Sequence, residues 1–112
     1  MTFYIKKEND IVIDPYSVKK ESGFKEVSIE ILEKLYLFAM QGNKVNQKRN
    51  LSYCKVCKSK VSYHNCNDFI SDYMIKVSNE QHSYLIPSLI FHTVKEHDAT
   101  FPEDLIDIIL EQ

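Results

Sequence analysis

The stretch FHTVKEH, residues 91–97, places His92 and His97 five positions apart in a segment that otherwise reads as a short apolar helix. Farther toward the N-terminus, YCKVCKS contains Cys54 and Cys57, which are separated by two residues. Thiolate and imidazole groups are the ligands that zinc prefers in structural sites, where four of them surround the ion as a tetrahedron. A Cys-x2-Cys turn lets two sulfurs converge on one point, so the sequence predicts that these four residues bind one zinc ion per chain.

The spacing of the two histidines sets a condition on this helix. Side chains five positions apart diverge by about 140° around an ideal α-helix of about 3.6 residues per turn. The last turn must therefore widen, or change its pitch, before both rings can reach one ion. The break in the helical pattern at Asp98, Ala99 and Thr100 leaves room for this change.

The whole pattern is Cys54-x2-Cys57-x34-His92-x4-His97. Its two ends resemble the C2H2 zinc finger, in which a cysteine knuckle faces a helix with histidines about three to five residues apart. The central spacing departs from that family, which has about 12 residues between the two pairs. The stretch HSYLIPSLIFHTVKEH, residues 82–97, also resembles segments of small uncharacterised bacterial proteins that carry such a site. These resemblances imply that one zinc ion joins the cysteine knuckle to the helix.

A second ligand set lies closer together in the chain and stays open as an alternative. Cys54 and Cys57 are followed by His64 and Cys66, which offer the same chemistry. This set requires the two later residues, which point the same way on a strand, to face the knuckle, and it leaves the helix histidines unexplained. Without a metal role, Cys66 is expected to be a buried thiol, and His82 is expected at the surface of a hairpin. A redox pair is disfavoured because no thioredoxin-like βαβ pattern surrounds the cysteines.

The N-terminal half is expected to contain one hairpin and one helix. TFYIKKENDIVIDP, residues 2–15, alternates around a turn and predicts a β-hairpin, whereas residues 16–27 read as an exposed connection. Ser28 is a typical N-cap, and Gly42 is typical of the residue that ends a helix. The apolar stripe of the helix between them comprises Ile29, Leu32, Leu35, Tyr36 and Ala39.

The C-terminal half is expected to surround the knuckle with further short elements. After a polar loop over residues 43–50, residues 51–65 predict two short strands joined through the knuckle. DYMIKVSNEQHSYLIP, residues 72–87, predicts a second hairpin, and a helix over residues 88–97 follows. These elements indicate a single α+β zinc-binding domain over residues 1–112, with antiparallel hairpins and about three helices.

The last of these helices is expected near the C-terminus. Thr100 and Glu103 have the spacing of a capping box, in which each side chain satisfies a free backbone N–H group at the helix start. Its predicted core side comprises Leu105, Ile106, Ile109 and Leu110.

Composition and charge limit the compartments in which the protein is expected to act and the partners that it is expected to bind. The chain has 112 residues, a net charge of −2 and three cysteines, and the odd cysteine count without a secretory signal favours a reducing, cytoplasmic setting over disulfides. Apolar runs fall far short of the roughly 18 residues that span a bilayer, so no membrane partner is expected. Charge is uneven, because residues 44–60 contain no acid and residues 96–112 contain no Lys or Arg. The bases of the first segment are Lys44, Lys48, Arg49, Lys55, Lys58 and Lys60.

Three functional hypotheses follow from these features. Four ligands fill the zinc sphere, so the first is a structural zinc that supports a protein-interaction or regulatory module with a protein partner. The second is a nucleic-acid-binding protein that uses segment 44–60 with Tyr53 and Tyr63 as stacking faces, because the apolar helix 88–97 carries no side chains suited to reading bases. The third is a zinc-dependent enzyme, although HExxH, deaminase and phosphate-loop motifs are all missing from the sequence.

Overall fold

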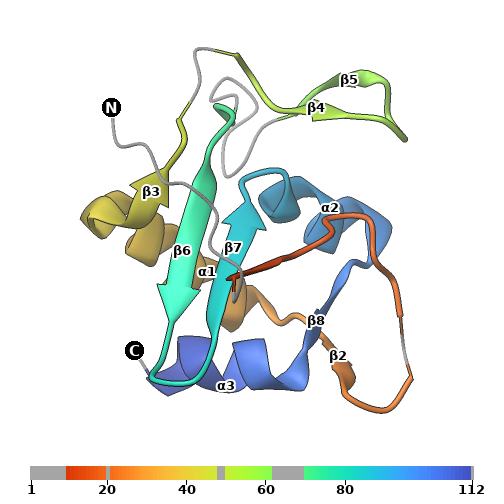
Figure 1. The fold of residues 1–112 in the computed structure, drawn as a ribbon. Coiled ribbons are helices and arrows are strands. Elements are labelled where there is room, and N and C mark those ends of the chain that lie inside the picture. The colour runs from red at the N-terminus through yellow and green to blue at the C-terminus, as the bar shows by residue number, and fades with distance from the viewer. Residues whose placement is uncertain (1–9, 20, 48–49, 62–69, 112) are drawn as a thin grey trace.

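The computed structural model describes residues 10–19, 21–47, 50–61 and 70–111, and these residues form an α+β fold, as the sequence predicts (Figure 1). The helices are α1 (Ile29–Phe38), continued by the π-helical turn η1 (Ala39–Asn43), α2 (Ile90–His97) and α3 (Glu103–Glu111). The strands are β1 (Asp10–Val12), β2 (Phe24–Glu26), β3 (Lys44–Val45), β4 (Tyr53–Cys54), β5 (Ser59–Lys60), β6 (Met74–Ser78), β7 (Ser83–Pro87) and β8 (Thr100–Pro102).

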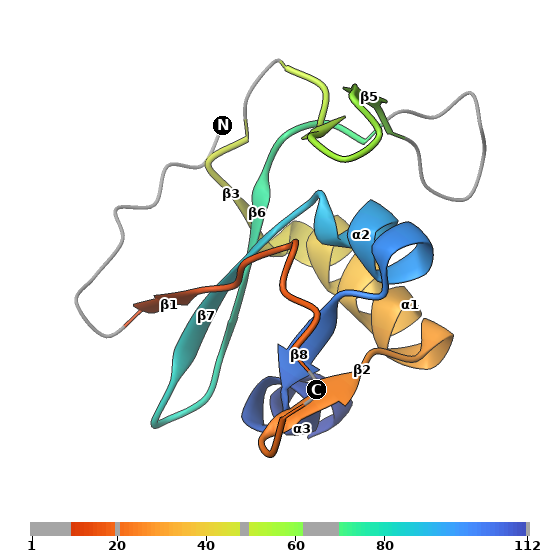
Figure 2. The same ribbon diagram turned by 90° about the vertical axis from the view of Figure 1, so that its right-hand side faces the viewer.

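A four-stranded sheet of order β1-β7-β6-β3 forms the framework. The predicted second hairpin is confirmed, because β6 and β7 pair antiparallel with Ile75 opposite Ile86 and Val77 opposite Tyr84. All four of these side chains are buried. The helices α1, α2 and α3 lie on one side of this sheet (Figure 2). The apolar side chains that alternate along the hairpin therefore form the sheet side of the core.

The N-terminal segment departs from the expected antiparallel pattern. β1 pairs with β7 in parallel, with Ile11 opposite Tyr84. The first strand of the predicted hairpin, at residues 3–5, lies outside the described residues. The expectation of an exposed connection over residues 16–27 is wrong in part, because β2 lies within it and pairs antiparallel with β8. Both differences involve long-range partners that local sequence does not specify.

The first helix follows its predicted chemistry closely. The Ser28 hydroxyl accepts a hydrogen bond from the Ile31 N–H at 3.3 Å, and Gly42 has a φ of 101°, the left-handed conformation that glycine adopts readily. One member of the predicted apolar stripe is misplaced, because Ile29 is 71% exposed. Ile31 is buried in its place.

The predicted capping box of the last helix is wrong. Thr100 lies in β8 rather than at a helix start, and its hydroxyl donates to the Lys19 carbonyl at 2.7 Å. The helix begins at Glu103, whose N–H donates to the Gly23 carbonyl at 2.9 Å. Leu110, predicted in the core, is 44% exposed. The buried residues of α3 are Leu105, Ile106, Ile108 and Ile109.

One apolar cluster joins the sheet, the three helices and β8. Its fully buried members include Leu35 of α1, Phe91 of α2, and Phe101 and Leu105 near the C-terminus. This core fixes the position of α2, which carries the two histidines. No helix among the described residues is long and apolar enough to cross a membrane.

Candidate metal centre

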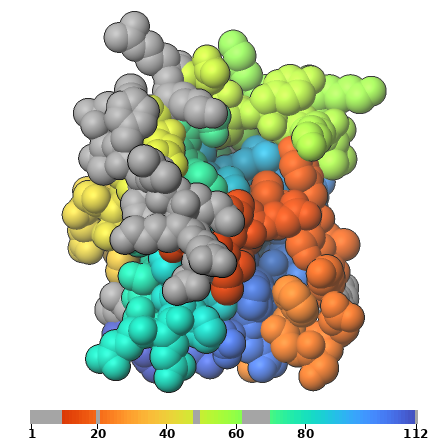
Figure 3. Space-filling model, viewed as in Figure 1, coloured from red at the N-terminus to blue at the C-terminus, as the bar shows by residue number. Residues whose placement is uncertain are grey.

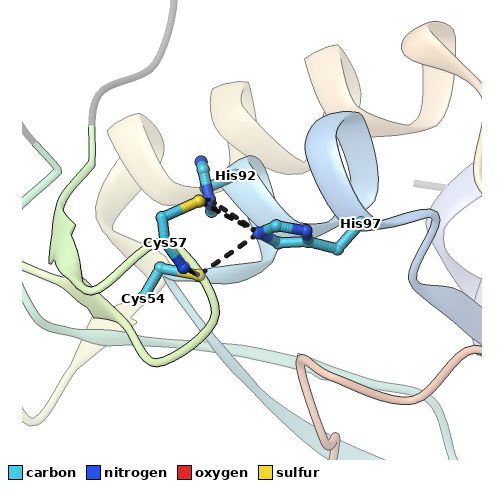
Figure 4. A group of neighbouring side chains, drawn as sticks. All are labelled: Cys54, Cys57, His92 and His97. Atoms are coloured by element: carbon cyan, nitrogen blue, oxygen red, sulfur yellow. Dashed lines mark hydrogen bonds between the residues drawn. The ribbon is translucent and has the colours of Figure 1, made fainter.

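Two elements far apart in the sequence bring the four predicted residues together (Figure 4). Cys54 ends β4 and Cys57 lies in the turn before β5, whereas His92 and His97 project from α2. One ligand atom from each residue lies within 4.8 Å of the other three, which is close enough for all four to hold a single metal ion. No other group of three or more His, Cys, Asp or Glu residues in the described part of the chain meets this condition.

The separations between these atoms can be compared with a zinc tetrahedron. Zinc lies about 2.3 Å from sulfur and about 2.0–2.1 Å from nitrogen, so tetrahedral edges are about 3.6 Å for sulfur–nitrogen and about 3.3 Å for nitrogen–nitrogen. The Cys57 sulfur lies 3.4 Å from His92 Nε2 and 3.3 Å from His97 Nε2. The Cys54 sulfur lies 3.3 Å from His97 Nε2, and the two Nε2 atoms are 3.2 Å apart. These edges are within a few tenths of an ångström of the geometry that zinc requires.

Hydrogen bonding alone does not account for this arrangement. His97 Nε2 faces three partners at once, namely Cys54, Cys57 and His92. A neutral imidazole nitrogen carries either one hydrogen or one lone pair, so it satisfies one such contact well and not three. The two rings meet at an interplanar angle of 74°, and both Nε2 atoms lie within hydrogen-bonding distance of the Cys57 sulfur. A cation at that point would accept a lone pair from every ligand.

The knuckle, which consists of β4, β5 and the turn between them, positions its two cysteines through backbone hydrogen bonds. The Lys58 N–H donates to the Cys54 carbonyl at 2.7 Å, and the Cys57 N–H donates to the Cys54 sulfur at 3.5 Å. Lys58 itself has a φ of 56°, which places it in the left-handed region. The turn therefore directs both sulfurs inward and supplies an N–H group that stabilises negative charge on one of them.

Two further contacts attach the knuckle to the rest of the fold. The Lys55 N–H donates to the Tyr16 hydroxyl at 2.9 Å, while the Lys55 ammonium lies 5.5 Å from the centre of the same ring. Burial, only partly offset by the hydrogen bond from Lys55, raises the pKa of Tyr16 above its ordinary value. Tyr16 thus stays neutral and serves the knuckle turn as a hydrogen-bond acceptor.

A buried serine pair makes the second attachment, between the start of the knuckle and the start of α2. Ser88 Oγ lies 3.0 Å from Ser52 Oγ and donates to the Ser71 carbonyl at 2.8 Å. It also accepts a hydrogen bond from the Tyr73 N–H at 3.2 Å. Both serines are buried, so these bonds fix the two halves of the site in a region without water to replace them.

The end of α2 has the widened turn that the histidine spacing demands. The N–H of Asp98 and the N–H of Ala99 both donate to the Thr93 carbonyl, the second at 3.1 Å. These bonds span five and six residues rather than the four of an α-helix. Asp98 adopts the left-handed conformation, with φ 55°. This wider last turn rotates His97 back toward the side of the helix from which His92 projects.

Electrostatics at the site favours the neutral forms of Cys57 and His92. Desolvation, reinforced by the neighbouring Cys54 and by Glu96, raises the pKa of the Cys57 thiol. Desolvation, followed by the nearby His97, lowers the pKa of His92. A neutral imidazole is the form that binds metal, and a bound divalent cation would reverse the preference of the thiols by stabilising thiolates.

The remaining histidine and cysteine predictions have mixed outcomes. His82 is exposed at the end of the β6–β7 turn, as the sequence predicts. His64 and Cys66 lie outside the described residues, as does Tyr63, so the local ligand set stays a prediction. The sequence offered no signal for Tyr16, whereas Ser88 could have been noticed as a polar residue within an apolar run.

Comparisons with known proteins give one match. Neither the curated proteins nor the solved structures contain a match to this chain. A family model covers residues 18–110, which include β2 to β8, α1, α2, all but the last residue of α3, and the four residues of the candidate centre. The chain therefore belongs to the family described as Domain of unknown function (DUF7919).

Proposed function

We propose that this protein binds one zinc ion per chain through Cys54, Cys57, His92 and His97, and that the ion has a structural role in a binding module. The observation that carries the proposal is the convergence of four ligand atoms within 4.8 Å of one another, with three sulfur–nitrogen separations and the nitrogen–nitrogen separation close to the edges of a zinc tetrahedron. A CxxC knuckle facing a two-histidine helix is the ligand type that structural zinc sites use.

A structural role fits the number of ligands better than a catalytic one. Catalytic zinc sites have about three protein ligands and keep one position for water or substrate. Here four residues converge, so a position for water or substrate would require one of them to leave or the ion to become five-coordinate. Glu96 lies next to His97 in the chain but is exposed on α2, and neighbouring helix positions point in different directions. An enzyme is therefore not the function that we propose.

The ion would provide stability that the knuckle cannot obtain from apolar contacts. Residues 55–60 are all exposed, whereas Cys54 and Val61 at their two ends are buried. A loop of this kind gains little from the hydrophobic effect, so coordination to α2 would hold it in one conformation. The module would act in a reducing compartment such as the cytoplasm, where free thiolates persist, and would present the fixed knuckle to a binding partner.

Metal analysis tests the proposal directly. Protein purified without added metal is expected to contain about one zinc per chain by elemental analysis. Replacement with Co2+ should give the intense visible bands of tetrahedral cobalt together with thiolate-to-metal charge transfer. His92→Ala should lose both signals, and His82→Ala, a matched change in an exposed histidine, should keep them.

Two outcomes would contradict the proposal. A folded wild-type protein that contains no metal and takes up none during Co2+ titration would exclude the site. Loss of metal in His64→Ala and Cys66→Ala, with retention in His92→Ala, would assign the ion to the local ligand set instead.

A further inference from the structure

The outer face of the knuckle combines an exposed aromatic ring with a lysine directly beside it. In the antiparallel pair β4–β5, Tyr53 lies opposite Lys60 and Cys54 lies opposite Ser59. Successive residues of a strand point to opposite faces, so the Tyr53 and Lys60 side chains share the face that turns away from the metal ligands. Tyr53 is 54% exposed, which is unusual for an aromatic residue that has a core available.

Exposed lysines lie on the same knuckle as this ring. Lys55, Lys58 and Lys60 are exposed, and residues 44–60 contain no Asp or Glu. The Lys55 ammonium already lies over the Tyr16 ring, so Lys58 and Lys60 are better placed to meet a ligand. Segment 50–61, yellow-green in Figure 3, projects from one end of the molecule.

The backbone of Lys58 adds a separate observation. Its φ of 56° lies in the left-handed region, where a residue with a Cβ atom costs about 1–2 kcal/mol relative to the ordinary helical conformation. Glycine adopts this conformation without that cost. A lysine at such a position suggests that its side chain serves a purpose unrelated to the stability of the turn.

We propose that the outer face of the knuckle binds single-stranded nucleic acid, with a base stacked on Tyr53 and backbone phosphates paired with Lys58 and Lys60. A positively charged surface that carries an exposed aromatic ring is the usual arrangement in proteins that bind single strands without sequence preference. The inference rests on the proposed function in one respect, because the metal would hold the knuckle in the shape that presents these side chains.

The same features disfavour other anionic partners. A duplex hides its base faces within the stack, so it would leave Tyr53 without a role, and the apolar face of α2 is buried against the core and unable to enter a groove. An acidic peptide would pair with the lysines but would gain no stacking energy from the ring. Single-stranded nucleic acid uses the ring and the charges together.

The binding test uses the full chain with its metal content measured on the same sample. A fluorescein-labelled oligothymidylate of roughly 12 nucleotides, within the range bound by small single-strand modules, is titrated with protein and followed by fluorescence anisotropy. The affinity should fall as salt rises, with a slope of log K against log salt of about −2 for two to three phosphate contacts. A duplex of the same length should bind more weakly.

Variants separate stacking from charge. Tyr53→Leu should weaken binding by about fivefold to a hundredfold, the range found when a stacked base loses its aromatic partner. Tyr53→Phe, which keeps the ring, should bind like the wild type. Lys58→Gly should reduce the salt slope by about 0.7 while relieving the turn of its left-handed lysine, and Lys60→Gln should have the same effect on the slope. Lys25→Gln, on β2 at the other end of the molecule (Figure 1), is the charge control and should change neither quantity.

Each unfavourable result has a distinct meaning. A zinc-loaded wild-type protein that fails to bind the oligonucleotide at low ionic strength overturns this inference and leaves the proposed function intact. Equal affinity in Tyr53→Leu and Tyr53→Phe, or equal competition by polyglutamate of matched charge, also overturns it and points to an acidic protein partner. Oligonucleotide binding by wild-type protein that contains no metal and takes up none from Co2+ would instead support this inference and contradict the proposed zinc site.

Discussion

Different forces stabilise two regions of the molecule. One is the knuckle, and the other is the body, which comprises the four-stranded sheet, the three helices and the pair β2–β8. In the body, Phe101, Leu105 and Ile109 are fully buried against the hairpin β6–β7 and α1. In the knuckle, the six residues 55–60 are all exposed. The contacts that hold this region are the hydrogen bond to the Tyr16 hydroxyl, the Ser52–Ser88 pair and the four candidate metal ligands. The body can therefore fold by hydrophobic burial, whereas the knuckle depends on a few directional contacts.

This contrast implies two levels of stability within one small chain. Segments with few buried apolar contacts open locally at a lower free-energy cost than the core to which they are attached. If the proposed zinc ion is removed, the knuckle should open while the body remains folded.

Loss of the metal should affect the knuckle far more than the body. Structural zinc sites in finger peptides contribute on the order of 10 kcal/mol of binding free energy. In His92→Ala, amide hydrogen exchange should accelerate strongly over residues 54–57 and 88–97, because the coordination that joins the two segments is gone. Exchange in β6, β7 and α3 should change little, and His82→Ala should match the wild type. Uniform acceleration across the whole chain would show that body and knuckle form one cooperative unit.

A cavity in the body should give the converse result. Phe101→Ala removes a fully buried ring, and such changes cost about 3–5 kcal/mol. The free energy of unfolding obtained from urea denaturation should fall by that amount, while the protein that remains folded should still contain about one zinc ion per chain. A metal content that falls in proportion to the loss of stability would mean that the site depends on the body more directly than its contacts indicate.

Ser88→Ala examines the junction between the two regions. Its buried hydroxyl contacts Ser52 before the knuckle and the Ser71 carbonyl and Tyr73 N–H beside the sheet. Removing it leaves buried polar partners unsatisfied, at a cost of about 1–3 kcal/mol. Both the urea midpoint and the affinity for Co2+ should therefore decrease. Ser83→Ala, in a strand of the same sheet, is the control, because the Ser83 hydroxyl has no hydrogen-bond partner among the described residues. If only the urea midpoint or only the affinity for Co2+ decreases, Ser88 supports one of the two regions and does not join them.

Features set by local chemistry could be predicted from the sequence. Ser28 caps α1 because its hydroxyl is the natural acceptor for a free N–H group two or three residues on, and Gly42 takes the left-handed conformation that other residues avoid. The four residues of the candidate centre were recognisable for a similar reason, since few other roles require two cysteines and two histidines at these spacings. The histidine spacing also predicted the widened last turn of α2, in which the Thr93 carbonyl accepts a hydrogen bond from the Ala99 N–H.

Features set by distant partners could not be predicted in this way. Thr100 has the sequence context of an N-cap, yet its hydroxyl donates to Lys19 because the pairing of β2 with β8 brings that carbonyl alongside. Ile29 fits the apolar stripe of α1, but the packing of the helix leaves it in solvent and buries Ile31. Tyr16 supports the knuckle from 39 residues away. In each case a tertiary contact determined the outcome, and local pattern carries no information about it.

The smallest expected effect concerns a contact that belongs to the body alone. The Ser28 hydroxyl accepts one hydrogen bond, from the Ile31 N–H at 3.3 Å, and replacement of such a cap by alanine costs about 1 kcal/mol. Ser28→Ala should therefore lower the urea midpoint slightly, because α1 packs on the core through Leu32 and Leu35. Co2+ affinity and amide exchange over residues 54–57 should stay at wild-type values, since no described contact of Ser28 reaches the knuckle. Ser28→Asp, which keeps an oxygen acceptor at the N-terminal end of the helix dipole, should restore the midpoint. A change in Co2+ affinity comparable to the change in stability would show that even a weak perturbation of the body reaches the metal ligands, and the separation of the two regions would then be wrong.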